Sequence, residues 1–71
     1  MPVSIRQIRA FEAVAAVGSF TEAAKRLNLT QSAVSMLVRQ LEGELGLALF
    51  VRTGRGVALT EFGAEAHPTL T

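Results

Sequence analysis

Residues 19–35 read SFTEAAKRLNLTQSAVS, and this run contains two helix starts separated by one short turn. The first start is Ser19, which is followed three residues later by Glu22. This spacing is a capping box, in which the serine and glutamate side chains bond amides that a helix start leaves free. The residues that follow are good helix formers, so the pattern predicts a short helix over about 20–27.

The second start lies just beyond that helix. Asn28 and Leu29 form the turn, and Thr30 caps a longer helix that runs over about 31–45 and ends at Gly46. Five apolar residues at helical spacing are predicted to form its buried face: Val34, Leu37, Val38, Leu41 and Leu45. Two helices joined by so short a turn are typical of a helix-turn-helix.

The residues that precede this unit predict a first helix. Ser4 and Gln7 form another capping box, so we expect a helix over about 5–17. Gly18 ends it, because glycine adopts the left-handed conformation that closes many helices.

The residues that follow the third predicted helix change period. Leu49–Arg52 and Val57–Leu59 are β-prone runs, and the glycine-containing residues 53–56 predict a four-residue hairpin connection between them. Thr60 caps a fourth helix that begins at Glu61. The predicted fold class is mainly α, a winged helix-turn-helix with a three-helix core and a two-stranded β wing. Because the fourth helix begins so near the last residue, we expect the chain to be cut from a longer protein.

Length and composition limit the architecture and the location. The 71 residues suffice for one small domain, and 49% hydrophobic against 18% charged residues is too apolar for disorder. The longest uncharged run, residues 27–38, is too short for a membrane helix, and Glu12 interrupts the apolar stretch that could pass for a signal peptide. With no Cys, the chain is expected to work in a reducing cytoplasm, with no membrane partner.

Catalysis is not expected. His67 is the single His and the sequence has no Cys, Asp or Tyr, so a nucleophile cannot be paired with a base and an orienting acid. The acidic residues are all Glu and are interpreted as solvated helix charges. Residues 53–56 lack the lysine and hydroxyl of a phosphate loop. We therefore predict no enzyme, no cofactor and no metal site.

The outward face of the third helix suggests what the domain contacts. It carries small hydroxyls, an amide, a thioether and a cation, with no acidic residue before Glu42. Glutamine can pair with adenine, serine can bond either kind of base edge, and methionine can pack on a thymine methyl. An ordinary solvated face has a similar composition, but the position after a short helix and a tight turn favours a DNA-reading helix. The predicted base-reading residues are Gln31, Ser32, Ser35 and Met36.

Other polar residues are placed to hold the DNA backbone. Ser19 and Thr21 offer hydroxyls and free amides at the start of the second helix, and Arg52 and Arg55 flank or tip the hairpin. Arg39 adds a cation on the third helix. Capping and hairpin solubility are the plainer roles of these residues. Residues 19–60 carry five basic and three acidic side chains, a modest excess, so we expect one copy to bind weakly and a dimer to be required.

The first helix is more apolar than one core face requires, and the fourth helix has no mate. Pairing between these helices in two copies would cover both surfaces. The predicted homodimer interface consists of Ile5, Val14, Val17, Phe62 and Ala66.

Four motifs occur in order along almost the whole chain: SFTEAA at 19–24, TQSAVS at 30–35, LFVR at 49–52 and LTEFG at 59–63. Together they closely resemble the amino-terminal DNA-binding domain of LysR-type transcriptional regulators. The resemblance implies a bacterial transcription factor with its DNA-binding domain at 1–59 and the start of a linker and dimerisation helix at 60–71. It also implies a small-molecule effector domain that this chain lacks, and tetramers of the complete protein. The expected DNA sites are inverted repeats in promoters. The expected location is the cytoplasm, with the protein at the nucleoid when it is bound to DNA.

The resemblance also carries residue roles. It implies base reading by the four residues named above, phosphate contacts by Thr21 and Thr30, and wing contacts by Arg52 and Arg55. Position 32 is Ser where the family often has Pro, and position 36 is Met where it often has Arg, so the preferred DNA sequence can differ from that of relatives. The alternative is a winged-helix module whose outward face docks a protein, and such a module would tolerate acidic substitutions that DNA would not.

Overall fold

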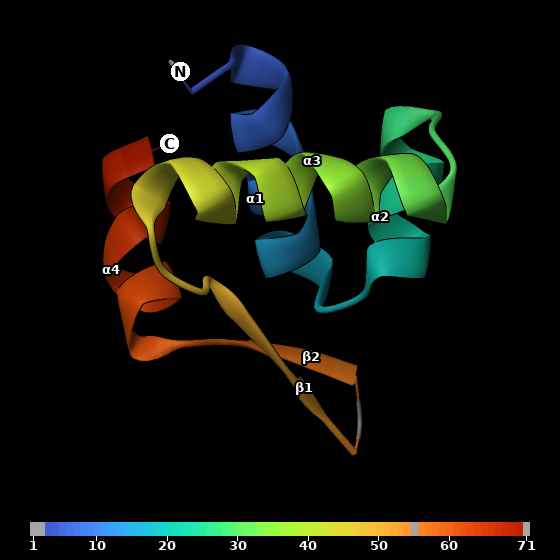
Figure 1. Cartoon of the computed structure of the whole chain (residues 1–71). Helices are drawn as coiled ribbons and strands as arrows, with labels where there is room; N and C mark the ends of the chain where they lie inside the picture. The colour runs from blue at the N-terminus through green and yellow to red at the C-terminus, as the bar shows by residue number, and fades with distance from the viewer. Residues whose placement is uncertain (1–2, 55, 71) are drawn as a thin grey trace.

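The computed structural model describes residues 3–54 and 56–70, with side chains as far as Glu65 (Figure 1). Three helices pack against one another, a hairpin extends away from them, and a further helix follows the hairpin. The elements are α1 (Ile5–Val17), α2 (Phe20–Leu27), α3 (Gln31–Leu45), β1 (Phe50–Thr53), β2 (Gly56–Leu59) and α4 (Glu61–Leu70). The mainly α, winged fold class is therefore confirmed, and all four helices start where the caps predicted.

Helix starts are fixed by the predicted hydroxyl side chains. The Gln7 amide donates to Ser4 Oγ at 3.2 Å, and the Ser4 amide donates to the Gln7 side chain at 3.2 Å, which completes the capping box of α1. Thr30 caps α3 by accepting from the Ala33 amide at 3.1 Å. In each case a side chain satisfies an amide that the helix itself cannot.

The turn between α2 and α3 depends on Asn28. Its φ of 60° is left-handed, a conformation that asparagine tolerates better than most residues. The Leu29 amide then donates to the Ala24 carbonyl at 2.9 Å, which closes the end of α2. The chain reverses within a few residues and brings the start of α3 close to the start of α2.

The core consists of two apolar clusters. The larger one is formed by α1, α2 and α3 through Ala10, Val14, Ala23, Ala24, Val34 and Val38, and the smaller one by Phe11, Leu41 and Leu49. Phe50 packs against both clusters, with its ring centroid 5.4 Å from that of Phe11 and 5.8 Å from that of Phe20. This residue therefore fixes the hairpin to the helical core.

The hairpin differs from its prediction. Thr53 pairs with Gly56, so the connection has two residues rather than four, and β1 begins at Phe50 rather than at Leu49. Leu49 is instead fully buried, and its amide donates to Glu42 Oε2 at 2.7 Å. The local sequence shows that Leu49 has β propensity. It does not show that Leu49 is buried in the core, where it is not part of the strand pairing.

Two interpretations of α3 residues were wrong. Glu42 is half-buried and accepts from the Leu49 and Phe50 amides, so it holds the entry to the wing rather than serving as a solvated charge. Leu45, which was predicted on the buried face of α3, is 38% exposed. No helix within 3–54 and 56–70 is long and apolar enough to cross a membrane.

Candidate nucleic-acid interface

One face of α3 is turned away from the apolar core. The opposite face is buried through Val34, Val38 and Leu41, and this directs the free face outward. Gln31, Ser32 and Arg39 are exposed, Met36 is 56% exposed, and Ser35 is half-buried. All four predicted base-reading side chains are thus on or beside one accessible surface.

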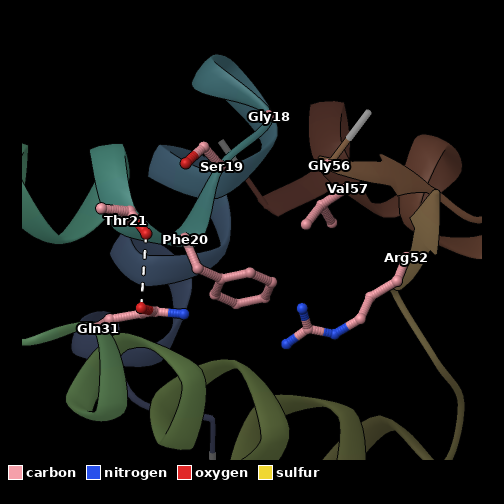
Figure 2. A pocket seen from close by; sticks show the side chains of 8 residues that line it. All are labelled: Gly18, Ser19, Phe20, Thr21, Gln31, Arg52, Gly56 and Val57. Atoms are coloured by element: carbon pink, nitrogen blue, oxygen red, sulfur yellow. Dashed lines mark hydrogen bonds between the residues drawn. The ribbon is translucent and has the colours of Figure 1, made fainter. Parts of the chain in front are cut away.

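A cleft of about 210 Å³ lies next to the first turn of α3 (Figure 2). Its walls come from the turn between α1 and α2, the start of α2, the start of α3 and both strands of the hairpin. The lining residues are Gly18, Ser19, Phe20, Thr21, Gln31, Arg52, Gly56 and Val57. The structure therefore brings together Ser19, Thr21 and Arg52, which were predicted to hold phosphates, with Gln31, which was predicted to read a base.

The cleft has a hydroxyl wall and a cationic wall. Arg52 extends from β1 toward the cleft, opposite Thr21 and Gln31 (Figure 2). Ser19 Oγ accepts from the Glu22 amide at 3.2 Å, and because a hydroxyl can also donate, its own proton can still bond an anionic oxygen. Hydroxyls, a helix start and a guanidinium on one cleft are groups that bind phosphate oxygens.

Close backbone contact between Gly18 and Gly56 shapes the floor of the cleft. Gly56 has a φ of 138°, a backbone conformation that residues other than glycine rarely adopt. A Cβ at this position would lie 3.1 Å from the Gly18 carbonyl oxygen. The wing can therefore approach the turn between α1 and α2 closely. Sequence reasoning treated these glycines as separate turn residues and missed their contact, because nothing local links positions 18 and 56.

The remaining backbone-contact residues lie elsewhere. Thr30 and Arg39 are exposed on α3 or at its cap and do not line the cleft. Arg55 lies outside the described residues. The Lys25 ammonium is 3.1 Å from the Glu22 carboxylate at the surface, so part of the positive charge of α2 is locally balanced.

The predicted dimer interface is only partly accessible. Ile5 is 67% exposed, Phe62 is 54% exposed, and Val17 is half-buried against the core. Val14 is fully buried, so its assignment to the interface was wrong. The core of the chain also covers Ala10 and Phe11, and the surplus apolar surface of α1 is smaller than the sequence suggested. The side chain of Ala66 lies outside the described part of the chain.

A three-helix core, a hairpin wing and an exposed α3 face beside a phosphate-compatible cleft define a winged helix-turn-helix DNA-binding domain. Residues 5–64 match the family model described as the bacterial regulatory helix-turn-helix protein, lysR family. The chain belongs to this family, whose matching region is a helix-turn-helix of transcriptional regulators and not a catalytic domain.

Two relatives illustrate the similarity. The RuBisCO operon transcriptional regulator of Allochromatium vinosum is 62% identical over 65 residues, which cover 92% of this chain and 22% of that protein. The HTH-type transcriptional activator AmpR of Providencia stuartii is 52% identical over 67 residues, covering 94% of this chain and 23% of that protein. The chain thus spans less than a quarter of the length of either relative.

Two solved structures have the same fold. The complex of the CbnR DNA-binding domain with DNA has a TM-score of 0.89 at 36% identity, covering 94% of this chain and 77% of that chain. The complex of the BenM DNA-binding domain with benA site 1 DNA has a TM-score of 0.88 at 36% identity, covering 94% and 75%.

Proposed function

We propose that this chain binds double-stranded DNA and reads its sequence with α3 in the major groove. One observation carries the proposal: the face of α3 from Gln31 to Arg39 is accessible and free of acidic side chains, and it adjoins the cleft that holds Arg52. A DNA duplex bound to this face would present base edges to α3 and phosphates to the cleft. The related CbnR and BenM domains, solved as DNA complexes, support the same use of the fold.

The roles divide by chemistry. Gln31, Ser32, Ser35 and Met36 contact base edges, because their amide, hydroxyl and thioether groups distinguish bases in the major groove. Hydroxyls and cations contact phosphates and sugars, and these contacts set the register of the protein without reading sequence. The backbone and wing residues are Ser19, Thr21, Thr30, Arg39, Arg52 and Arg55.

The binding unit is a homodimer in this proposal. Ile5 and Phe62 are large apolar side chains exposed at the starts of α1 and α4, where a second copy can cover them. Residues 1–59 then form the DNA-binding unit, and 60–71 begin a linker and dimerisation helix. Two α3 helices would occupy half-sites of an inverted repeat about 34–36 Å apart, or a multiple of this distance. In the longer regulator, a tetramer and a small-molecule effector domain complete the assembly in the cytoplasm.

A selection of bound duplexes from a random DNA pool, carried out at two salt concentrations, tests the proposal. The wild-type chain should enrich an inverted repeat. Gln31→Ala should change the preferred base at one position in each half-site, with a loss of about 1–3 kcal/mol on the best site. Arg52→Ala should weaken binding to all sequences alike and lower the salt slope by about one, since it removes a phosphate contact.

Other outcomes would contradict sequence reading. Retention of DNA without an enriched sequence, lost steeply with added salt, would reduce the function to phosphate binding. If a folded sample retained no DNA and Ser32→Glu left capture of a protein partner intact, the face would be a protein-docking surface instead.

A further inference from the structure

A side-chain hydrogen bond connects α2 with α3 at the edge of the cleft. The Thr21 hydroxyl donates to Gln31 Oε1 at 3.5 Å (Figure 2). Thr21 is the second residue of α2 and Gln31 is the first residue of α3. Both side chains are exposed, so core packing does not hold either of them in place. The bond therefore joins a residue assigned to phosphate contact with a residue assigned to base reading.

In the structure, the oxygen end of the Gln31 amide forms this bond. The side-chain amide of glutamine has an acceptor oxygen and two donor hydrogens on nitrogen, and rotation about its last bond exchanges the two ends. In Figure 2 the oxygen faces Thr21, and the nitrogen points toward the open side of the cleft, in the direction of Phe20 and Arg52. The end that remains fully available for a partner is the donor.

We propose that Thr21 is a positioning residue that sets base specificity. Its hydroxyl can donate to the Gln31 oxygen or accept from the nitrogen, and the proposal is that the donating arrangement of the structure is the one kept on DNA, with the nitrogen toward the base. This inference rests on the proposed function, in which Gln31 reads a base. A donor needs an acceptor on the base edge. In the major groove, adenine, guanine and thymine each present an acceptor, whereas cytosine presents the N4 amino group, a donor. The arrangement therefore selects against cytosine on the strand that Gln31 reads.

Two substitutions at position 21 separate this role from phosphate contact. Thr21→Val keeps the β-branched shape and removes the hydroxyl, whereas Thr21→Ser keeps the hydroxyl. Because the side chain is exposed, neither variant should unfold, and thermal unfolding checks this. The DNA probes are the duplex enriched by the wild-type chain and its three single-base-pair variants at the position that Gln31→Ala identifies.

The wild-type chain and Thr21→Ser should both discriminate against cytosine at that position. In Thr21→Val the free Gln31 amide can turn its oxygen toward the cytosine amino group, so this discrimination should fall about three- to tenfold, the range that one neutral hydrogen bond supplies. In the Gln31→Ala background, Thr21→Val should produce no further change in base preference.

The inference is overturned if Thr21→Val weakens all four duplexes by the same factor, since that is the signature of a phosphate contact. It is also overturned if Thr21→Val leaves the discrimination unchanged while Gln31→Ala abolishes it. A Gln31→Ala variant with unaltered base preference at every position would instead refute the proposed function itself, and the inference with it.

Discussion

At the scale of single residues, two glycines within helices have opposite environments. Gly63 is buried in α4, and a Cβ there would overlap the Leu49 carbonyl oxygen and lie 2.9 Å from Leu59 Cδ2. Gly43 in α3 is exposed, with nothing within 4 Å of an added Cβ. Gly63→Ala should therefore destabilise the domain by about 1–3 kcal/mol through overpacking, whereas Gly43→Ala should stabilise it by about 0.5–1 kcal/mol through helix propensity.

Urea unfolding of the two variants beside the wild-type chain measures both effects. Each variant is the control for the other, because the same methyl group is added to a glycine in a helix. A shift of the same sign in both would show that α4 does not pack against the residue before β1 as the structure has it.

Met36 provides a second test at this scale. Its thioether is 56% exposed on the reading face, where it can contact a thymine methyl but cannot form the bidentate bonds that arginine forms with guanine. Met36→Arg should move the preferred base at one position in each half-site from thymine toward guanine. Selection from a random duplex pool measures the change, with Arg39→Lys as a control that retains charge. An unchanged preference with uniformly tighter binding would place position 36 against a phosphate.

At the scale of elements, the attachment of the wing depends on one carboxylate. Glu42 Oε2 accepts from the Leu49 amide at 2.7 Å and from the Phe50 amide at 3.3 Å. Glu42→Ala leaves these amides without that acceptor in a half-buried place, so it should lower the free energy of unfolding by about 1–3 kcal/mol. Glu22→Ala is the comparison, since its exposed pair with Lys25 should contribute at most about 1 kcal/mol. Equal losses in urea unfolding would mean that Glu42 does not hold the wing.

Elements differ in how far the sequence predicts them. The helix starts were predicted correctly because a cap such as Ser4, Ser19 or Thr30 is a local pattern of a few residues. The wing was predicted as a hairpin, but its first strand was misplaced because Leu49 is taken into the core by contacts from α1 and α3. Such contacts join residues far apart in the sequence, and no local pattern records them.

At the scale of the whole molecule, the same distinction applies to the site. The periodicity of α3 predicted which of its residues face outward, since one apolar stripe fixes the opposite face. The cleft was not predicted, because it exists only where the wing meets the helix-turn-helix through Gly18 and Gly56. The burial of Val14 was missed for a related reason. The periodicity of α1 alone shows that Val14 lies on an apolar face, but not whether that face contacts α3 or a second copy of the chain.

The exposed apolar side chains predict how two copies bind DNA. If Ile5 and Phe62 pair copies of the chain, a duplex with both half-sites should be bound cooperatively, because the second copy then gains a protein contact as well as its DNA contacts. We expect at least about tenfold tighter binding per half-site than on a duplex with one half-site, which corresponds to a coupling of about 1.4 kcal/mol. Phe62→Glu should abolish this gain and leave binding to the single half-site unchanged, since position 62 lies outside the reading face and the cleft.

Titration of both duplexes with both proteins, at one salt concentration, measures the coupling. Independent binding of the wild-type chain to the two half-sites would refute the pairing of copies through these residues.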